Sequence, residues 1–136
     1  MNTKRMWYAS IAVFAVIFVI EFIVNAVLLD GIYKQTASVW RAEADIEKMM
    51  WLFWVGYLIF ALVFVRIYIK GYEIGKDNIG QGLRYGIYMG LLIAIPMNLG
   101  WYVVLPIPAA LSVYWAIAGM VEMIAAGITV ALIYRN

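Results

Sequence analysis

Four polar side chains interrupt stretches of the sequence that are otherwise almost wholly apolar: Glu21, Asn25, Asn98 and Glu122. A charged carboxylate near the centre of a bilayer costs roughly 2.5–3.5 kcal/mol on insertion scales, so each of these groups needs a partner. Glu21 and Asn25 stand four residues apart and therefore share one face of a helix. Two interpretations are open: a structural layer of hydrogen bonds between helices, or a cavity that binds a cation, a proton or a small amine.

Depth within the helices decides which of these groups can meet. At about 1.5 Å per residue, Glu21 and Tyr57 lie about 12 Å below the outer ends of their helices, and Asn98 lies about 10 Å below its own. Glu122 lies about 18 Å down, so it can meet Glu21 only across a step of roughly one helical turn. We therefore predict a polar ligand-binding pocket in the outer half of the protein, lined by Glu21, Asn25, Tyr57, Asn98, Trp101 and Glu122.

The composition predicts the elements that hold these residues within a membrane. The chain has 136 residues, of which 67% are hydrophobic and 13% are charged, whereas soluble domains have roughly 45–50% apolar and about 25% charged residues. One span needs about 20 apolar residues, so the chain has room for four spans and three connections. We predict an all-α membrane protein, a single four-transmembrane-helix bundle over 1–136 with spans near 6–29, 49–70, 83–105 and 109–134.

The third span carries the clearest packing signal. Small residues recur every four positions from Gly82 to Ala94, so they fall on one side of a helix and let another helix approach closely. Pro96 lacks a backbone donor and crowds the carbonyl of Leu92, which predicts a kink in the third helix. The fourth span has small residues at the same spacing, which predicts close crossing of these two helices; contact with another subunit is the open alternative. The predicted packing residues are Gly82, Gly86, Gly90, Ala94, Gly119 and Gly127.

Several kinds of chemistry are not predicted. The sequence contains no Cys and no His, which excludes disulfides, thiolate nucleophiles and the usual zinc and haem ligands. The methionines are interpreted as core packing, so no metal site is predicted, and no cofactor is indicated. Glu21 and Glu122 offer a carboxylate pair, but no nucleophile or phosphate-binding basic cluster lies at their depth, so catalysis is not predicted. The formal charge of +2 is small and dispersed, which argues against nucleic acid as a partner.

The distribution of Lys and Arg predicts the orientation of the chain in the membrane. With a cytoplasmic N-terminus, the cytoplasmic side holds seven basic residues and the opposite side holds three. The seven are Lys4, Arg5, Arg66, Lys70, Lys76, Arg84 and Arg135, and the three are Lys34, Arg41 and Lys48. We therefore predict a multi-pass membrane protein with both termini in the cytoplasm.

The size of the chain and the carboxylate Glu21 in the first span resemble the small multidrug resistance transporters. That resemblance implies four-helix subunits that work as antiparallel dimers and share the carboxylate between protons and substrates. The chain departs from that layout in its long connection over 30–48, of which 40–48 is predicted to be a helix leading into the second span. Its charge bias also argues against insertion in two orientations.

Two hypotheses of function follow. The first is a non-enzymatic protein of the lipid bilayer, an accessory subunit of a larger membrane complex or a homo-oligomer, whose outer-half pocket binds a small or lipidic ligand. The alternative is a proton- or cation-coupled small-molecule transporter that uses Glu21 and Glu122. The substitution Glu21→Gln separates them, because an amide keeps the hydrogen bonding of a structural group but cannot ionise for transport.

Overall fold

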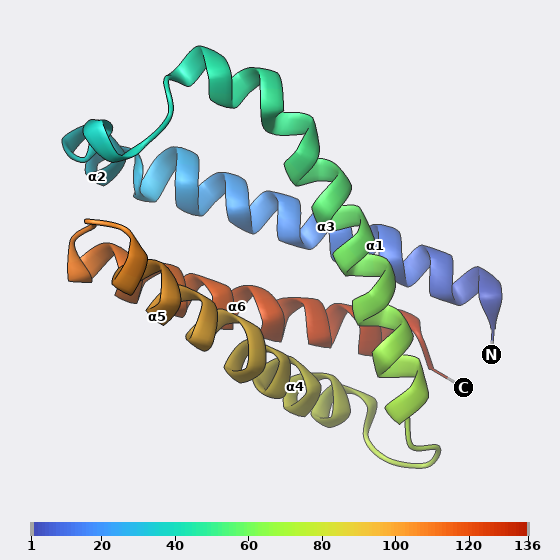
Figure 1. Cartoon of the computed structure of the whole chain (residues 1–136). Coiled ribbons are helices and arrows are strands. Elements are labelled where there is room, and N and C mark those ends of the chain that lie inside the picture. The colour runs from blue at the N-terminus through green and yellow to red at the C-terminus, as the bar shows by residue number, and fades with distance from the viewer. Residues whose placement is uncertain (1, 136) are drawn as a thin grey trace.

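The computed structural model describes residues 2–135, which fold into helices joined by short turns. Four helical runs in this part of the chain are long and apolar enough to cross a membrane: Thr3–Leu28, Glu43–Gly71, Asn78–Val104 and Ala109–Ile133. Both chain ends lie at the same end of the bundle (Figure 1), which we call the inner end after the predicted orientation. The prediction of an all-α four-helix bundle is confirmed.

Some of the four runs contain more than one kind of helix. The elements in chain order are α1 (Thr3–Phe22), the π-helix η1 (Ile23–Leu28), α2 (Asp30–Gln35), the 3₁₀-helix η2 (Ala37–Val39), α3 (Glu43–Gly71), α4 (Asn78–Met89), the π-helix η3 (Gly90–Ala94), α5 (Ile95–Val104) and α6 (Ala109–Ile133).

The span bounds predicted from hydrophobicity agree with these helices to within a few residues, and the main differences are polar extensions at helix starts. α1 begins earlier than predicted because the Asn2 side chain caps it, accepting a hydrogen bond from the Arg5 backbone N–H at 3.1 Å. Asp77 caps α4 in the same way through the Gly80 N–H at 2.5 Å. The helix predicted to lead into the second span exists but begins at Glu43 rather than at Trp40.

The irregularity predicted at Pro96 is a π-helical segment, η3, that lies directly before α5. Proline cannot donate a hydrogen bond to the carbonyl four residues earlier, and its ring crowds that carbonyl, so the regular α-helical pattern cannot continue through it. The wider π-helical turn accommodates this break. A second π-helix, η1, follows Glu21 in the first run without any proline, and it was not predicted.

α3 packs on the bundle through its second half only. Its buried residues, Ala61, Phe64, Val65 and Tyr68, all belong to that half. The first turns of α3 stand away from the other helices (Figure 1), and the aromatic and aliphatic residues there are largely exposed. The four helices are therefore packed closely at the inner end and more openly towards the outer end.

Two hydrophobic cores hold the bundle together. The larger one lies at the inner half and joins α1, α3, α4 and α6, with Val13, Ile17, Phe64 and Val130 among its most buried members. The smaller one lies at the outer end, where Leu29, Ile107 and Leu111 pack together.

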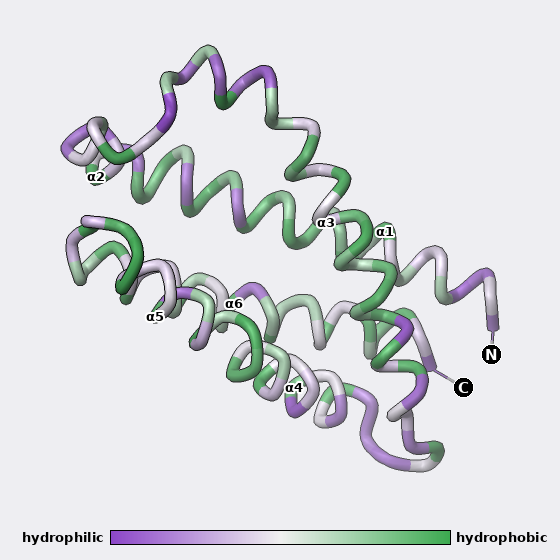
Figure 2. The backbone as a smooth tube through the Cα atoms, viewed as in Figure 1, coloured by the Kyte–Doolittle hydropathy of each residue, from purple (hydrophilic) through white to green (hydrophobic). Residues whose placement is uncertain are grey.

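Apolar residues cover the outside of the bundle as well as its inside. Large hydrophobic side chains such as Val103, Leu92 and Ile59 are more than half exposed, and apolar residues dominate the middle of the long helices whereas polar ones gather at the turns (Figure 2). Exposed apolar surface of this extent is typical of a lipid-facing protein. The four apolar helices are those of a small multi-pass membrane protein.

Candidate functional site

The centre of the candidate site is the end of α1, where Glu21 and Asn25 lie on one face. The Asn25 amide donates two hydrogen bonds back to Glu21, one to carboxylate Oε2 at 2.6 Å and one to the backbone carbonyl at 3.0 Å. Asn25 belongs to the π-helix η1, in which the α-helical hydrogen bonds are replaced by wider ones. The amide therefore also satisfies a carbonyl at the point where the helix changes its winding.

A chain of hydrogen bonds connects this pair to the outer end of the bundle. The Tyr33 hydroxyl donates to Asn25 Oδ1 at 2.5 Å, and it accepts a hydrogen bond from Trp115 Nε1 at 2.7 Å. Tyr33 lies on α2, which folds back towards the start of α6. The Tyr33 ring contacts the rings of Trp40 and Trp115. Burial raises the pKa of the Tyr33 phenol above its ordinary value, so the hydroxyl remains a donor at neutral pH.

The second carboxyl group, Glu122 of α6, lies close to Glu21 of the neighbouring α1, and so does the Tyr57 hydroxyl of α3. Only 6% of Glu122 is exposed, and its Oε1 atom is buried without a hydrogen-bond partner among the described residues. The sequence predicted that Glu122 lies roughly one helical turn deeper than Glu21, and the two side chains meet across this difference in depth. The site thus joins two carboxyl groups from opposite helices, one of which has an unsatisfied oxygen.

An apolar cavity of about 560 Å³ lies between the first run and α6, and neither Glu21 nor Glu122 lines it. It is lined from the first run by Ile20 and Val24, and from α6 by Ala118 and Val121. Ile20 and Val121 directly precede Glu21 and Glu122 in the sequence, so the cavity and the carboxyl pair lie at the same depth. The carboxyl pair and the apolar cavity are therefore two neighbouring features of the same two helices, and the carboxyl oxygens do not form part of the cavity wall.

Two of the predicted pocket residues lie elsewhere. The Asn98 amide donates to the Ala94 carbonyl at 2.7 Å within its own helix, and its backbone carbonyl accepts from Ser112 Oγ at 2.9 Å. Trp101 is 47% exposed on the outside of α5. The structure therefore brings together Glu21, Asn25, Tyr57 and Glu122, whereas Asn98 belongs to the contact between α5 and α6 and Trp101 faces outward.

The small residues of the third and fourth spans lie against each other. A Cβ atom added to Gly86 would stand 2.5 Å from the Met123 carbonyl oxygen, and Gly82 and Gly127 contact each other through their backbones. A Cβ on Gly119 would meet the side chain of Ala94 at 2.7 Å. This glycine seam leaves the backbones of α4 and α6 in direct contact beside the candidate site.

Sequence reasoning missed Tyr33 and Trp115 as members of the site. Both were hidden among aromatic residues that a membrane interface ordinarily contains. Asn25 and Tyr33 are eight residues apart in the sequence. This spacing would have placed them on one face of a helix only if the helix was assumed to continue past residue 29.

Comparison of the chain with protein-family models, with curated proteins and with solved structures found no match. Among the described residues there is also no cluster of three acidic groups that could hold a metal ion. The geometry of the site alone carries the functional argument.

Proposed function

We propose that this protein is a non-enzymatic membrane protein that binds a small or lipidic ligand at Glu21 and Glu122. The observation that carries the proposal is the buried, unpartnered Oε1 atom of Glu122. A buried acceptor without a partner costs about 1–3 kcal/mol, and a ligand that donates a hydrogen bond there removes this cost. A purely structural layer would gain nothing from keeping such an atom.

The surroundings of the carboxyl pair favour one class of ligand. Carboxyl oxygens accept hydrogen bonds and attract positive charge, while the cavity at the same depth of α1 and α6 has aliphatic walls from Ile20, Val24 and Val121. A ligand with an apolar body and a head that donates hydrogen bonds, above all a primary amine, would satisfy both parts. The polar network from Trp115 to Glu21 would hold the Glu21 side chain in position for that head.

The proposed orientation in the membrane rests on the distribution of basic residues, and the proposed partners rest on an exposed apolar surface. Both termini in the cytoplasm would place the pocket in the outer half of the bilayer, in line with the seven-to-three distribution of basic residues. The exposed first half of α3, with Trp51 and Phe53 on its surface, offers apolar area for a second copy of the chain or for a larger membrane complex. Both an accessory subunit and a homo-oligomer would use such a surface.

Proton- or cation-coupled transport is the second candidate, and one observation favours it. The hydrogen-bonded chain Trp115–Tyr33–Asn25–Glu21 leads from the outer end of the bundle to the carboxyl pair. Within this chain the Tyr33 hydroxyl and the Glu21 carboxyl are the groups that could take up and release protons, whereas the Trp115 N–H and the Asn25 amide would hold them in position. Uptake of an amine into proteoliposomes that depends on a pH gradient would support transport; binding without uptake would leave the first function.

The proposal is tested by the molecules that the purified protein retains. Native mass spectrometry of the full chain in mild detergent should show bound small or lipidic adducts on the wild type. Glu122→Gln should lose them, whereas Glu47→Gln, a change of the same chemistry on the exposed start of α3, should keep them. Equal adducts on all three proteins, or none on the wild type, would contradict the proposal.

A further inference from the structure

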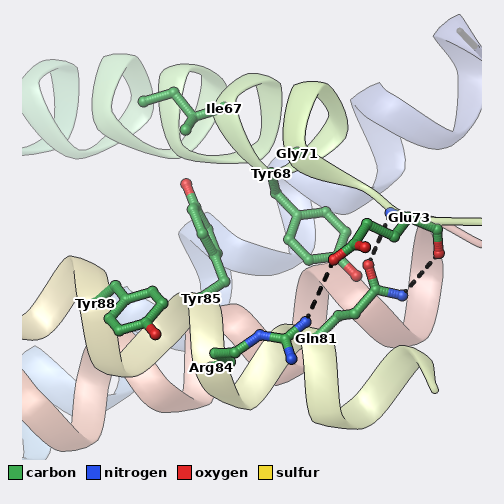
Figure 3. Close-up of a pocket in the computed structure, with 8 residues that line it drawn as sticks. All are labelled: Ile67, Tyr68, Gly71, Glu73, Gln81, Arg84, Tyr85 and Tyr88. Carbon is green, nitrogen blue, oxygen red and sulfur yellow. Dashed lines mark hydrogen bonds and ion pairs between the residues drawn. The ribbon is translucent and has the colours of Figure 1, made fainter. Parts of the chain in front are cut away.

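A second pocket lies at the inner end of the bundle, far from the carboxyl pair. It has a volume of about 220 Å³ and is formed between the end of α3 and the length of α4 (Figure 3). This volume is several times the roughly 30 Å³ that one water molecule occupies in the liquid. Its lining residues are Ile67, Tyr68, Gly71, Glu73, Gln81, Arg84, Tyr85 and Tyr88.

The wall of this pocket is fixed by hydrogen bonds that do not involve a ligand. The buried Gln81 amide donates to the Glu73 carbonyl at 3.0 Å and accepts from the Glu73 N–H at 2.8 Å, so it holds the connection over 72–77 onto α4. The Tyr85 hydroxyl reaches across to the Phe64 carbonyl of α3 at 2.6 Å. Little rearrangement would be needed for this pocket to accept a group of fitting chemistry.

One polar group of the pocket has no hydrogen-bond partner, and a second is held only by a long ion pair. The Tyr68 hydroxyl is buried without a hydrogen-bond partner among the described residues, and only 3% of Tyr68 is exposed. In Figure 3 it points towards the end of the pocket where Arg84 and Glu73 meet. The Arg84 guanidinium stands 3.6 Å from the Glu73 carboxylate, which is too long for a hydrogen bond.

The charge balance at this end favours an anion. Glu73 is already paired with Lys76, which lowers the pKa of the Glu73 carboxyl below its ordinary value and keeps it ionised. Lys76 and Arg84 both pair with Glu73, so these three side chains together keep one net positive charge that can attract an anion. Guanidinium donors and a tyrosine hydroxyl together match the oxygens of a phosphate group.

The position of the pocket indicates the source of that phosphate. Gly71 ends α3 and Asn78 begins α4, so the polar end lies at the level where lipid headgroups meet a membrane-spanning helix. The exposed side chains of Ile67 and Tyr88 continue the pocket along the apolar surface. An acyl chain could follow them while the headgroup stays at the polar end.

We propose that the pocket between α3 and α4 binds the phosphate group of a phospholipid from the inner leaflet, with Arg84 and Tyr68 as the residues that hold the phosphate. This site is independent of the ligand proposed for Glu21 and Glu122. Its occupation would also brace α3 against α4, which otherwise meet there through tyrosine rings.

The test compares two lipids that differ only in the phosphate headgroup, on the purified full chain in mild detergent. Dioleoylphosphatidylglycerol should bind the wild type in native mass spectrometry more tightly than dioleoylglycerol. Arg84→Gln should weaken phosphatidylglycerol binding about ten-fold, as expected for a lost charge-assisted hydrogen bond. Arg66→Gln removes an exposed arginine of α3 that does not line the pocket, and it should bind as the wild type does.

A second variant keeps the test decisive if Arg84→Gln folds poorly. Tyr68→Phe removes only the unpartnered hydroxyl, so it should weaken phosphatidylglycerol binding without lowering the melting temperature. Equal binding by wild type, Arg84→Gln and Tyr68→Phe would overturn the proposal, as would equal binding of dioleoylglycerol. Displacement of the lipid by millimolar inorganic phosphate would overturn the lipid source and indicate a soluble phosphate instead.

Discussion

α6 packs against the rest of the molecule on two faces, and the two faces are built differently. On one face, Gly127 and its neighbours bring the α6 backbone against α4, with no side chain between them at Gly82 and Gly86. On the other face, Glu122 reaches Glu21 through side chains, beside an apolar cavity. Where two helix backbones are in contact, neither helix can shift without a clash, whereas long side chains can change rotamer to admit another molecule. The comparison indicates a rigid pair of helices that carries an adaptable binding site.

The largest effect is expected where the contact is tightest. Gly86→Leu should destabilise the protein by about 3 kcal/mol or more, or prevent its folding, because the new side chain would enter the Met123 and Ile124 backbone. Gly100→Leu is the matched control, since a Cβ there meets nothing within 4 Å. Thermal unfolding in detergent measures both. A Gly86→Leu protein as stable as Gly100→Leu would show that α4 and α6 are not in direct contact.

Gly90 offers a second comparison within the glycine seam. A Cβ at Gly90 would stand 2.6 Å from Met120 Sδ, a flexible side chain that can move aside, whereas a Cβ at Gly86 meets backbone atoms. Gly90→Ala should therefore cost less than about 1 kcal/mol, and Gly86→Ala clearly more. The same melting temperature for both variants would mean that the contact between the helices accommodates an added methyl group equally well at both positions.

On the adaptable face, the network that positions Glu21 is the most sensitive part. Tyr33→Phe leaves the Asn25 carbonyl oxygen and the Trp115 N–H without a shared partner, which should cost about 1–2 kcal/mol. Tyr8→Phe, at an exposed tyrosine of α1, should change nothing. If the two variants unfold at the same temperature, the network does not support the outer end of the bundle.

Much of this architecture follows from the sequence for physical reasons. Hydrophobic length defines the four spans, and the four-residue spacing of Gly82 and Gly86 defines a packing side. The details of the site do not follow. An asparagine amide within a helix can bond to its own backbone or to another helix, and Asn98 does the first. The π-helix after Glu21 and the fold-back of Tyr33 depend on contacts between segments that no local pattern records.

A substitution at Glu122 distinguishes a site kept for binding from one kept for stability. Glu122→Met keeps a similar shape and removes a buried polar oxygen that has no hydrogen-bond partner, so it should stabilise the protein by about 1 kcal/mol. Glu47→Met on the exposed start of α3 serves as the control. A loss of stability in the Glu122 variant would favour the structural interpretation of the polar layer.

The smallest effect is expected at the exposed ion pairs of the inner connection. The pKa of Glu73 is lowered in the folded protein by Lys76, so its contribution to stability is present above the unfolded pKa and is lost as the pH falls through the folded value. Because the pair is exposed, solvent screens it and this contribution should be small. Comparing the unfolding of wild type and Glu73→Gln from neutral to acidic pH measures it, and a larger difference would mean that the connection stabilises the whole fold.

The central claim is that the carboxyl pair binds a ligand through a primary amine head, which carries a positive charge that an alcohol lacks. It is tested most directly by the dissociation constants of octylamine and octanol, which share one chain and differ in the head, measured by calorimetry on wild type and Glu122→Gln. We predict that the wild type binds octylamine at least ten-fold more tightly than octanol and that Glu122→Gln removes this preference. Equal binding of the two compounds by the wild type, or an unchanged preference in Glu122→Gln, would contradict the account.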